Sequence, residues 1–186
     1  MLREMTTWHL EIVDRRDVRP ARPRPDLRIE RAEIPCPELS HFLYTAVGGD
    51  HFWMDRLSWT WDRWMAWLDR PELATWIGSV SGTPAGYFEL ERQAEGDVEV
   101  AYFGLLPRFA GQGLGGALLS AAIERAWESG ARRVWLHTCS LDHPAALPAY
   151  QARGFRLFKT ETTVHDMPET SPGPWPGAGR ASATGS

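Results

Sequence analysis

Four glycines stand close together at positions 111, 113, 115 and 116, between a stretch typical of a strand and a stretch typical of a helix. Glycine has no Cβ, so backbone amides at such positions can close around an anion. The helix that follows would direct its first N–H groups and the positive end of its dipole to the same place. The spacing therefore predicts a phosphate-binding loop that needs few cationic side chains.

Several kinds of loop share this composition. Gly111, Gly113 and Gly116 fit the dinucleotide pattern G-x-G-x-x-G, but that unit has a carboxylate at the end of its next strand, and the stretch 134–138 ends without one. A triphosphate loop has Gly-Lys-Ser/Thr, which is missing after these glycines. A third interpretation, a coenzyme pyrophosphate, rests on the resemblance given next, and a helix start chosen for close packing alone stays open as an alternative.

Two segments resemble the GNAT N-acetyltransferase superfamily. Arg108-x-x-Gly111-x-Gly113 is similar to its pyrophosphate motif R/Q-x-x-G-x-G/A, and the stretch 143–155 is similar to its N-x-x-A-x-x-x-Y-x-x-x-G-F segment, with His143 in place of the usual asparagine. The spacing leaves room for one helix and one strand between them. The resemblance covers roughly residues 27–166. It implies an α/β (α+β) fold, with a mixed central sheet splayed at the acetyl-CoA site and helices on both faces.

The resemblance also implies how acetyl-CoA would be held. Amides of the glycine loop would bind the pyrophosphate, and a free strand edge at Phe103 to Leu105 would bind the pantetheine arm. The N–H of Leu105 would donate to the thioester carbonyl, and His143 could donate one hydrogen bond to the arm. The expected cofactor-binding residues are Phe103, Gly104, Leu105, Arg108, Gly111, Gln112, Gly113, Leu114, Gly115, Gly116, His143 and Tyr150.

Acetyl transfer to an amine needs an acid for the leaving thiolate and a base for the ammonium. Tyr150 stands at the family's general-acid position, although a tyrosine tied to a backbone carbonyl is the alternative. Glu99 matches the glutamate base of related strands, and Glu89 on the neighbouring strand is its rival. Both could simply be solvated charges. His41, His51 and His137 titrate in the useful range, and their spacing selects none of them.

Five of the ten tryptophans stand in one stretch, at positions 53, 59, 61, 64 and 67. Trp61 and Trp64 fit the apolar stripe of a helix capped by Thr60, which predicts that they are core residues. The others lie off that stripe, so they line a pocket, form a subunit contact or lie on the surface. We expect Trp53 and Trp59, with His51, to face an aromatic or cationic amine.

The elements form one domain. Residues 1–26 are expected to be an N-terminal strand and an Arg/Pro linker, residues 27–167 the acetyltransferase domain, and residues 168–186 a disordered tail rich in Pro, Gly, Ser and Ala. Strands are predicted at 8–13, 27–32, 74–80, 85–91, 98–105, 134–139 and 155–164. Helices are predicted from Pro35 to Gly48, after Thr60, from Gly115 to Trp127 and from Pro144 to Arg153.

The net charge of −4 and pI near 5.9 give no basic surface for nucleic acid. The sequence shows no long apolar run and no apolar secretory block, so no membrane association and a cytoplasmic location are expected. Cys36 and Cys139 lack metal-ligand spacing, so free thiols and no metal are expected. The favoured function is acetylation of a small-molecule primary amine. Acetylation of a protein N-terminus or lysine, a non-catalytic acyl-CoA-binding module and a homodimer stay open.

Overall fold

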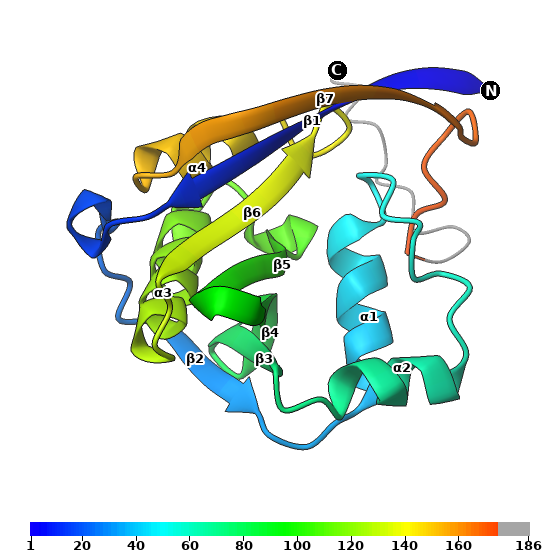
Figure 1. Ribbon diagram of the computed structural model, residues 1–186. Coiled ribbons are helices and arrows are strands. Elements are labelled where there is room, and N and C mark those ends of the chain that lie inside the picture. The colour runs from blue at the N-terminus through cyan, green and yellow to red at the C-terminus, as the bar shows by residue number, and fades with distance from the viewer. Residues whose placement is uncertain (175–186) are drawn as a thin grey trace, which may run out of the picture.

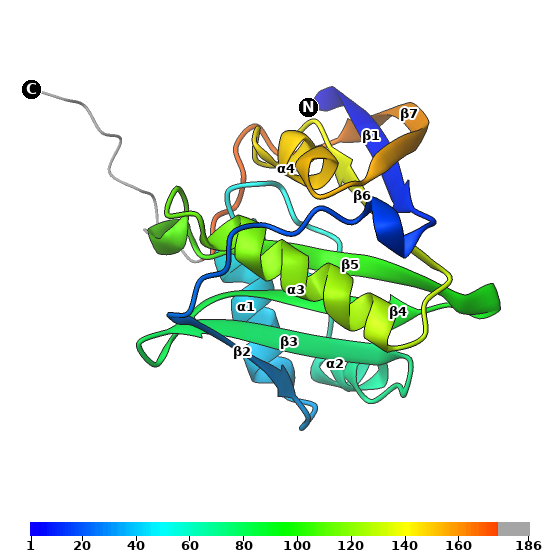
Figure 2. The same cartoon turned by 90° about the vertical axis from the view of Figure 1, so that its left-hand side faces the viewer.

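The computed structural model describes residues 1–174. Its centre is a seven-stranded sheet in the order β2-β3-β4-β5-β6-β1-β7, with helices on both faces (Figures 1 and 2). The strands are β1 Leu2–Ile12, β2 Leu27–Ala32, β3 Leu73–Val80, β4 Thr83–Arg92, β5 Asp97–Leu105, β6 Arg133–Cys139 and β7 Arg156–Asp166. The helices are α1 Pro37–Gly48, α2 Trp61–Leu68, α3 Leu114–Glu128 and α4 Ala146–Ala152.

The sheet is mixed, as the sequence predicts. β5 and β6 run parallel, whereas the other neighbouring strands are antiparallel. The N-terminal strand is longer than its local pattern indicates, because it starts at Leu2 and is inserted between β6 and β7. Leu10 and Ile12 anchor its second half in the core, whereas its first half is held by pairing with β7, from Leu2 opposite Asp166 onward.

Helix α3 covers one face of the sheet (Figure 2). Its buried residues belong to one core with Phe88 and Leu90 of β4 and with Val98 and Val100 of β5. Because successive strand residues point to opposite faces, the intervening Glu89 and Glu99 point away from α3. Helices α1 and α2 lie on that second face (Figures 1 and 2), where a smaller apolar cluster forms from Leu43, Val47 and Tyr87.

Helix α2 follows its predicted cap but only part of its predicted stripe. The Thr60 hydroxyl accepts a hydrogen bond from the Arg63 backbone N–H at 3.3 Å, and Trp64 is buried. The prediction that Trp61 is a core residue was wrong, because its side chain is 56% exposed. Trp61 is the first residue of the helix, and its indole N–H donates to Glu38 in the first turn of α1 at 3.2 Å.

The chain after β7 returns to the end of α1. The Ser171 hydroxyl donates to the Gly49 carbonyl and accepts from the Phe52 N–H at 3.2 Å, and the Gly173 N–H donates to Gly49 at 3.0 Å. The rest of the expected tail, residues 175–186, lies outside the described residues. Among the described helices, none combines the length and the apolar character that crossing a bilayer requires.

Candidate active site

The glycine loop connects β5 to α3. Gly111 and Gly113 have φ values of +75° and +76°, a left-handed conformation that glycine adopts without a steric penalty. Gly113 is the N-cap of α3, so the loop lies at the free N–H groups of a 15-residue helix. Gly116 has another role, because a Cβ there would approach the Ala21 side chain to 3.1 Å. The loop thus has the backbone geometry expected of an anion site.

The N-terminal linker braces this loop. The Arg24 guanidinium donates to the carbonyl of Gln112, and the Ala21 N–H donates to the Ser120 hydroxyl of α3 at 2.8 Å. The Gln112 side chain in turn donates to the Arg108 carbonyl at 2.8 Å, while the Arg108 side chain is exposed. Segments far apart in the sequence therefore hold the loop in place.

A gap in the sheet opens beside the loop. The pairing of β5 with β6 runs from Asp97 opposite Arg133 to Glu99 opposite Trp135 and then ends. β5 stays paired with β4 as far as Leu105, which lies opposite Gly86. Phe103, Gly104 and Leu105 therefore carry a strand edge that does not pair with β6.

Tyr150 of α4 borders this edge. Its ring packs against Phe103 of β5, with the ring centroids 6.1 Å apart, and it is buried in the main core. Burial raises the pKa of its phenol well above the ordinary value, so the hydroxyl keeps its proton at neutral pH.

His143 lies just before α4. Its ring accepts a hydrogen bond from the Ala145 N–H at 3.1 Å, and the ring centroids of His143 and His51 lie 5.7 Å apart.

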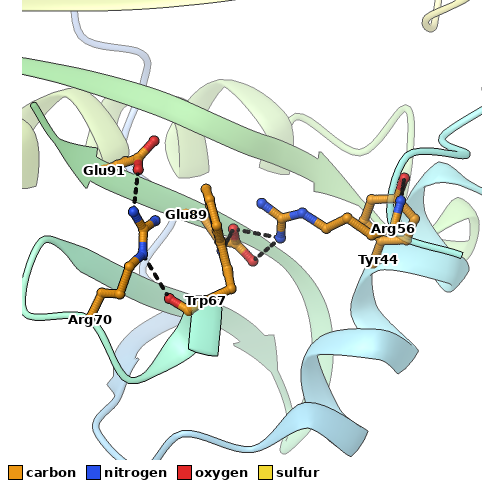
Figure 3. A network of polar contacts seen from close by, with 6 residues as sticks. All are labelled: Tyr44, Arg56, Trp67, Arg70, Glu89 and Glu91. Atoms are coloured by element: carbon orange, nitrogen blue, oxygen red, sulfur yellow. Dashed lines mark hydrogen bonds and ion pairs between the residues drawn. The ribbon is translucent and has the colours of Figure 1, made fainter. Parts of the chain in front are cut away.

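Glu89 is held in a buried ion pair (Figure 3). Its two oxygens accept from Arg56 Nη1 at 2.9 and 3.1 Å, and one also accepts from the Trp67 indole N–H at 3.1 Å. Both side chains of the pair are at most 3% exposed. Figure 3 shows the network continuing through Arg70, which binds Glu91 and the Trp67 carbonyl. The Glu89 carboxylate thus accepts three hydrogen bonds, two from Arg56 and one from Trp67.

Aromatic rings surround the Arg56 guanidinium. Its central carbon lies between 4.0 and 6.0 Å from five ring centroids, those of Tyr102, Trp67, Trp59, Trp64 and Tyr44. The backbone N–H of Arg56 also donates to the Tyr44 hydroxyl at 3.2 Å. This aromatic cage accounts for three of the five clustered tryptophans. Trp59, expected to face a substrate, contacts the protein's own arginine.

Trp53 occupies a different place. Its indole N–H donates to Asp142 at 3.2 Å, and its ring packs on Tyr102 of β5 with the centroids 5.0 Å apart. Asp142 follows β6 and accepts from the Thr138 hydroxyl at 2.7 Å and from the Cys139 N–H at 2.9 Å. Trp53 therefore ties the loop after α1 to the loop after β6, on the side of the sheet away from α3.

Glu99 lies where β5 and β6 part. One carboxylate oxygen accepts from the Gln93 side-chain amide at 2.8 Å, and the other lies 3.2 Å from His137 Nδ1. The Glu99 side chain is 11% exposed and that of His137 is 49% exposed. Of the three histidines that the sequence left equivalent, His137 is the one in contact with Glu99. Within residues 1–174, no group of three or more His, Cys, Asp or Glu side chains is arranged to hold a metal ion.

A family comparison agrees with this geometry. The model of the acetyltransferase (GNAT) family matches residues 33–155. The chain belongs to this family. The match includes the glycine loop, the splayed strands and Tyr150, so the GNAT fold predicted from two short motifs is confirmed. No curated protein matches the chain.

Solved structures show the same GNAT fold. A GCN5-related N-acetyltransferase from Sphaerobacter thermophilus has a TM-score of 0.66 at 17% identity, with 87% of this chain aligned to 50% of that one. A second from Kribbella flavida has a TM-score of 0.61 at 20% identity, over 86% and 58%. A Bacillus subtilis acetyltransferase in complex with CoA has a TM-score of 0.55 at 25% identity, over 70% and 76%. The chain thus spans only 50% and 58% of the first two.

Sequence reasoning missed several residues of this GNAT site. Arg56 drew no attention, although an arginine within a tryptophan-rich stretch is a sequence signal for cation–π packing. Asp142, which binds Trp53, and Arg24, which braces the glycine loop, carry no local signal, because each acts on a partner more than 80 residues away.

Proposed function

We propose that this protein transfers an acetyl group from acetyl-CoA to the primary amine of a small molecule, by direct attack of the amine on the thioester. The observation that carries the proposal is the junction of an unpaired β5 edge, Phe103 to Leu105, with a glycine loop at the start of α3. A free strand edge can bind the amides of pantetheine, and the loop amides can bind the pyrophosphate. The CoA complex of the Bacillus subtilis relative supports the choice of coenzyme.

Tyr150 is the proposed general acid. It lies beside Phe103, and its raised pKa keeps the hydroxyl protonated, so the O–H can donate to the sulfur as the C–S bond breaks. The amide N–H of Leu105 is the proposed donor to the thioester oxygen, whose negative charge grows as the amine attacks. Both groups belong to elements that the core holds rigidly, which favours a fixed geometry for the reacting atoms.

The acceptor is proposed to approach from the face opposite α3. There Trp53 and Tyr102 present aromatic rings, while Glu99 and Asp142 present carboxylates. Rings attract cations, and carboxylates attract ammonium groups, so the surface suits a positively charged amine. The Trp53–Asp142 hydrogen bond links two loops across this side, which favours a small molecule over an extended peptide. His51 and His143 lie in contact at its margin.

The proposal is tested by thiol release from acetyl-CoA over a panel of small amines, with lysine peptides and free N-terminal peptides as separate arms. Rapid release with a small amine and slow release with peptides is the expected result. Faster release with peptides would instead favour a protein acetyltransferase. Absence of release in every arm, combined with tight binding of acetyl-CoA, would favour a non-catalytic acyl-CoA-binding module.

The coenzyme site has its own test in Gly113→Val. Calorimetry should show that acetyl-CoA affinity falls at least about 10-fold, because a β-branched residue strains the left-handed N-cap and crowds the loop amides. Gly82→Val is the matched control, since Gly82 has φ +81° in the β3–β4 turn and a Cβ there would meet no atom within 4 Å. Equal acetyl-CoA affinity in the two variants would refute the loop as the pyrophosphate site.

A further inference from the structure

His137 and Glu99 form a pair at the end of the β5–β6 ladder. His137 lies two residues beyond Trp135, the last β6 residue that pairs with β5. Both oxygens of Glu99 have partners, Gln93 on one and His137 on the other, so the carboxylate is fixed in position. The imidazole is half exposed, whereas the carboxylate is nearly buried. One end of the pair thus reaches solvent on the face proposed for the acceptor.

The carboxylate determines which ring nitrogen carries the proton. An ionised carboxylate only accepts hydrogen bonds, so Nδ1 of His137 must be the donor in their 3.2 Å contact. In the neutral imidazole the lone pair then lies on Nε2. Nε2 has no hydrogen-bond partner among residues 1–174. The basic nitrogen Nε2 of His137 is therefore free to accept a proton beside the gap between β5 and β6.

The surroundings of His137 are acidic. The hydrogen bond from Nδ1 to Glu99 raises the pKa of His137, and the negative charges of Asp142 and Asp55 raise it further against the opposing effect of burial. The ring of His9 on β1 lies 5.9 Å away, and His9 itself pairs with Glu161 of β7. The same carboxylates would concentrate an ammonium acceptor near Nε2.

We propose that His137 is a catalytic residue of the acetyl transfer, accepting a proton from the acceptor ammonium on Nε2 while Glu99 holds the ring in position. This inference rests on the proposed function. The ammonium loses one proton to Nε2, and the exposed imidazolium releases it to solvent. The freed lone pair forms the C–N bond, the C–S bond breaks, and the second N–H proton reaches the CoA thiolate by way of Tyr150. Glu99 is accordingly a positioning residue that acts through the imidazole.

The test compares an acceptor that must lose a proton with one that is already neutral. Tyramine is an ammonium at neutral pH, whereas 4-methoxyaniline is a free amine. His137→Gln should lower kcat/KM for tyramine about 100-fold at pH 7 and remove the inflection that the imidazole gives to the acid side of the pH profile, so that the rate follows the fraction of free amine. The loss with 4-methoxyaniline should stay below about 3-fold, because no proton has to be removed before attack.

Glu99→Gln tests the positioning role of the carboxylate, and His165→Gln is the control for replacing a histidine. Glu99→Gln should lower the rate with tyramine about 10-fold and move the acid side of its pH profile to lower pH, since the imidazole loses its anionic partner. His165→Gln is the control, because His165 is an exposed histidine of β7 whose ring contacts Thr163. It should behave as wild type with both amines.

Different results would overturn the role of His137 and the proposed acetyltransferase function. Suppose that wild type acetylates tyramine, and that His137→Gln has the same kcat/KM at every pH or loses kcat/KM equally with both amines. Either result overturns the assignment of His137 as a catalytic residue, and the proposed acetyltransferase function is unaffected. If wild type acetylates neither these two amines nor any other in the panel, the proposed function fails and the assignment fails with it.

Discussion

Glu89 and Glu99, on adjacent strands, point to the same face of the sheet but have different partners and different exposure to solvent. Glu89 of β4 is 1% exposed and faces Arg56, which lies inside the aromatic cage. Glu99 of β5 faces His137, whose side chain is 49% exposed. An arginine keeps its charge at all ordinary pH values, whereas a histidine gains and loses a proton near neutrality. The first pair is therefore fixed in charge, and the second can move a proton.

The contrast separates stability from chemistry. Burying two charges costs solvation free energy, and good geometry with full hydrogen bonding offsets that cost, so such a pair is most sensitive to the loss of one partner. The Arg56–Glu89 pair joins the loop between α1 and α2 to the centre of β4, which fixes the chain that carries Trp53. Its contribution to the proposed acetyl transfer is then indirect. In the Glu99–His137 pair the imidazole is half exposed, as a group that exchanges protons with solvent must be.

The largest effect is expected from Arg56→Ala. It leaves the Glu89 carboxylate buried without its counter-charge and empties the aromatic cage, so the free energy of unfolding should fall by about 3–5 kcal/mol. Urea denaturation followed by tryptophan fluorescence measures the loss. The control is Arg16→Ala, which removes an exposed ion pair with Asp14 and should leave the midpoint nearly unchanged. Equal midpoints for the two variants would contradict the structural role of the buried pair.

A smaller effect is expected when both charges of the buried pair are removed. In Arg56→Met combined with Glu89→Gln no charge is left unpaired, and the glutamine oxygen can still accept from the Trp67 indole N–H. The loss of stability should shrink to about 1–2 kcal/mol, and acetyl transfer should persist with its pH profile unchanged. A folded double variant that has lost all turnover would instead return Glu89 to the mechanism as a base.

The sequence predicted the parts of this site that are encoded locally. The glycine pattern predicted a loop of small residues before a helix, and such a loop stands at the start of α3, with left-handed φ values at Gly111 and Gly113. Tyr150 followed from a short motif on one helix. In each case the residues that specify the geometry are within a few positions of one another.

The parts that escaped prediction depend on distant pairing. That β1 lies between β6 and β7 is fixed by contacts such as Thr7 opposite Cys139, which local alternation does not encode. The partners of Glu89 and Glu99 depend on strand register and on where the Arg56 loop lies, so the sequence favoured Glu99 by its motif but left Glu89 as a rival. The three-dimensional structure is needed to show that Glu89 is buried against Arg56 whereas Glu99 contacts His137.

The smallest effect expected is on the titration of His137 itself. Because its pKa is raised above the ordinary 6.5, its contribution to stability is fully present below that pH and is lost as pH rises through the folded value. Since the side chain is half exposed, solvent screening keeps this contribution small. NMR titration of the imidazole measures the pKa directly. It should exceed 6.5 in wild type and fall toward that value in Glu99→Gln. A His137 pKa unaffected by Glu99→Gln would mean that the carboxylate does not act through the ring, and the two glutamates would then differ in burial alone.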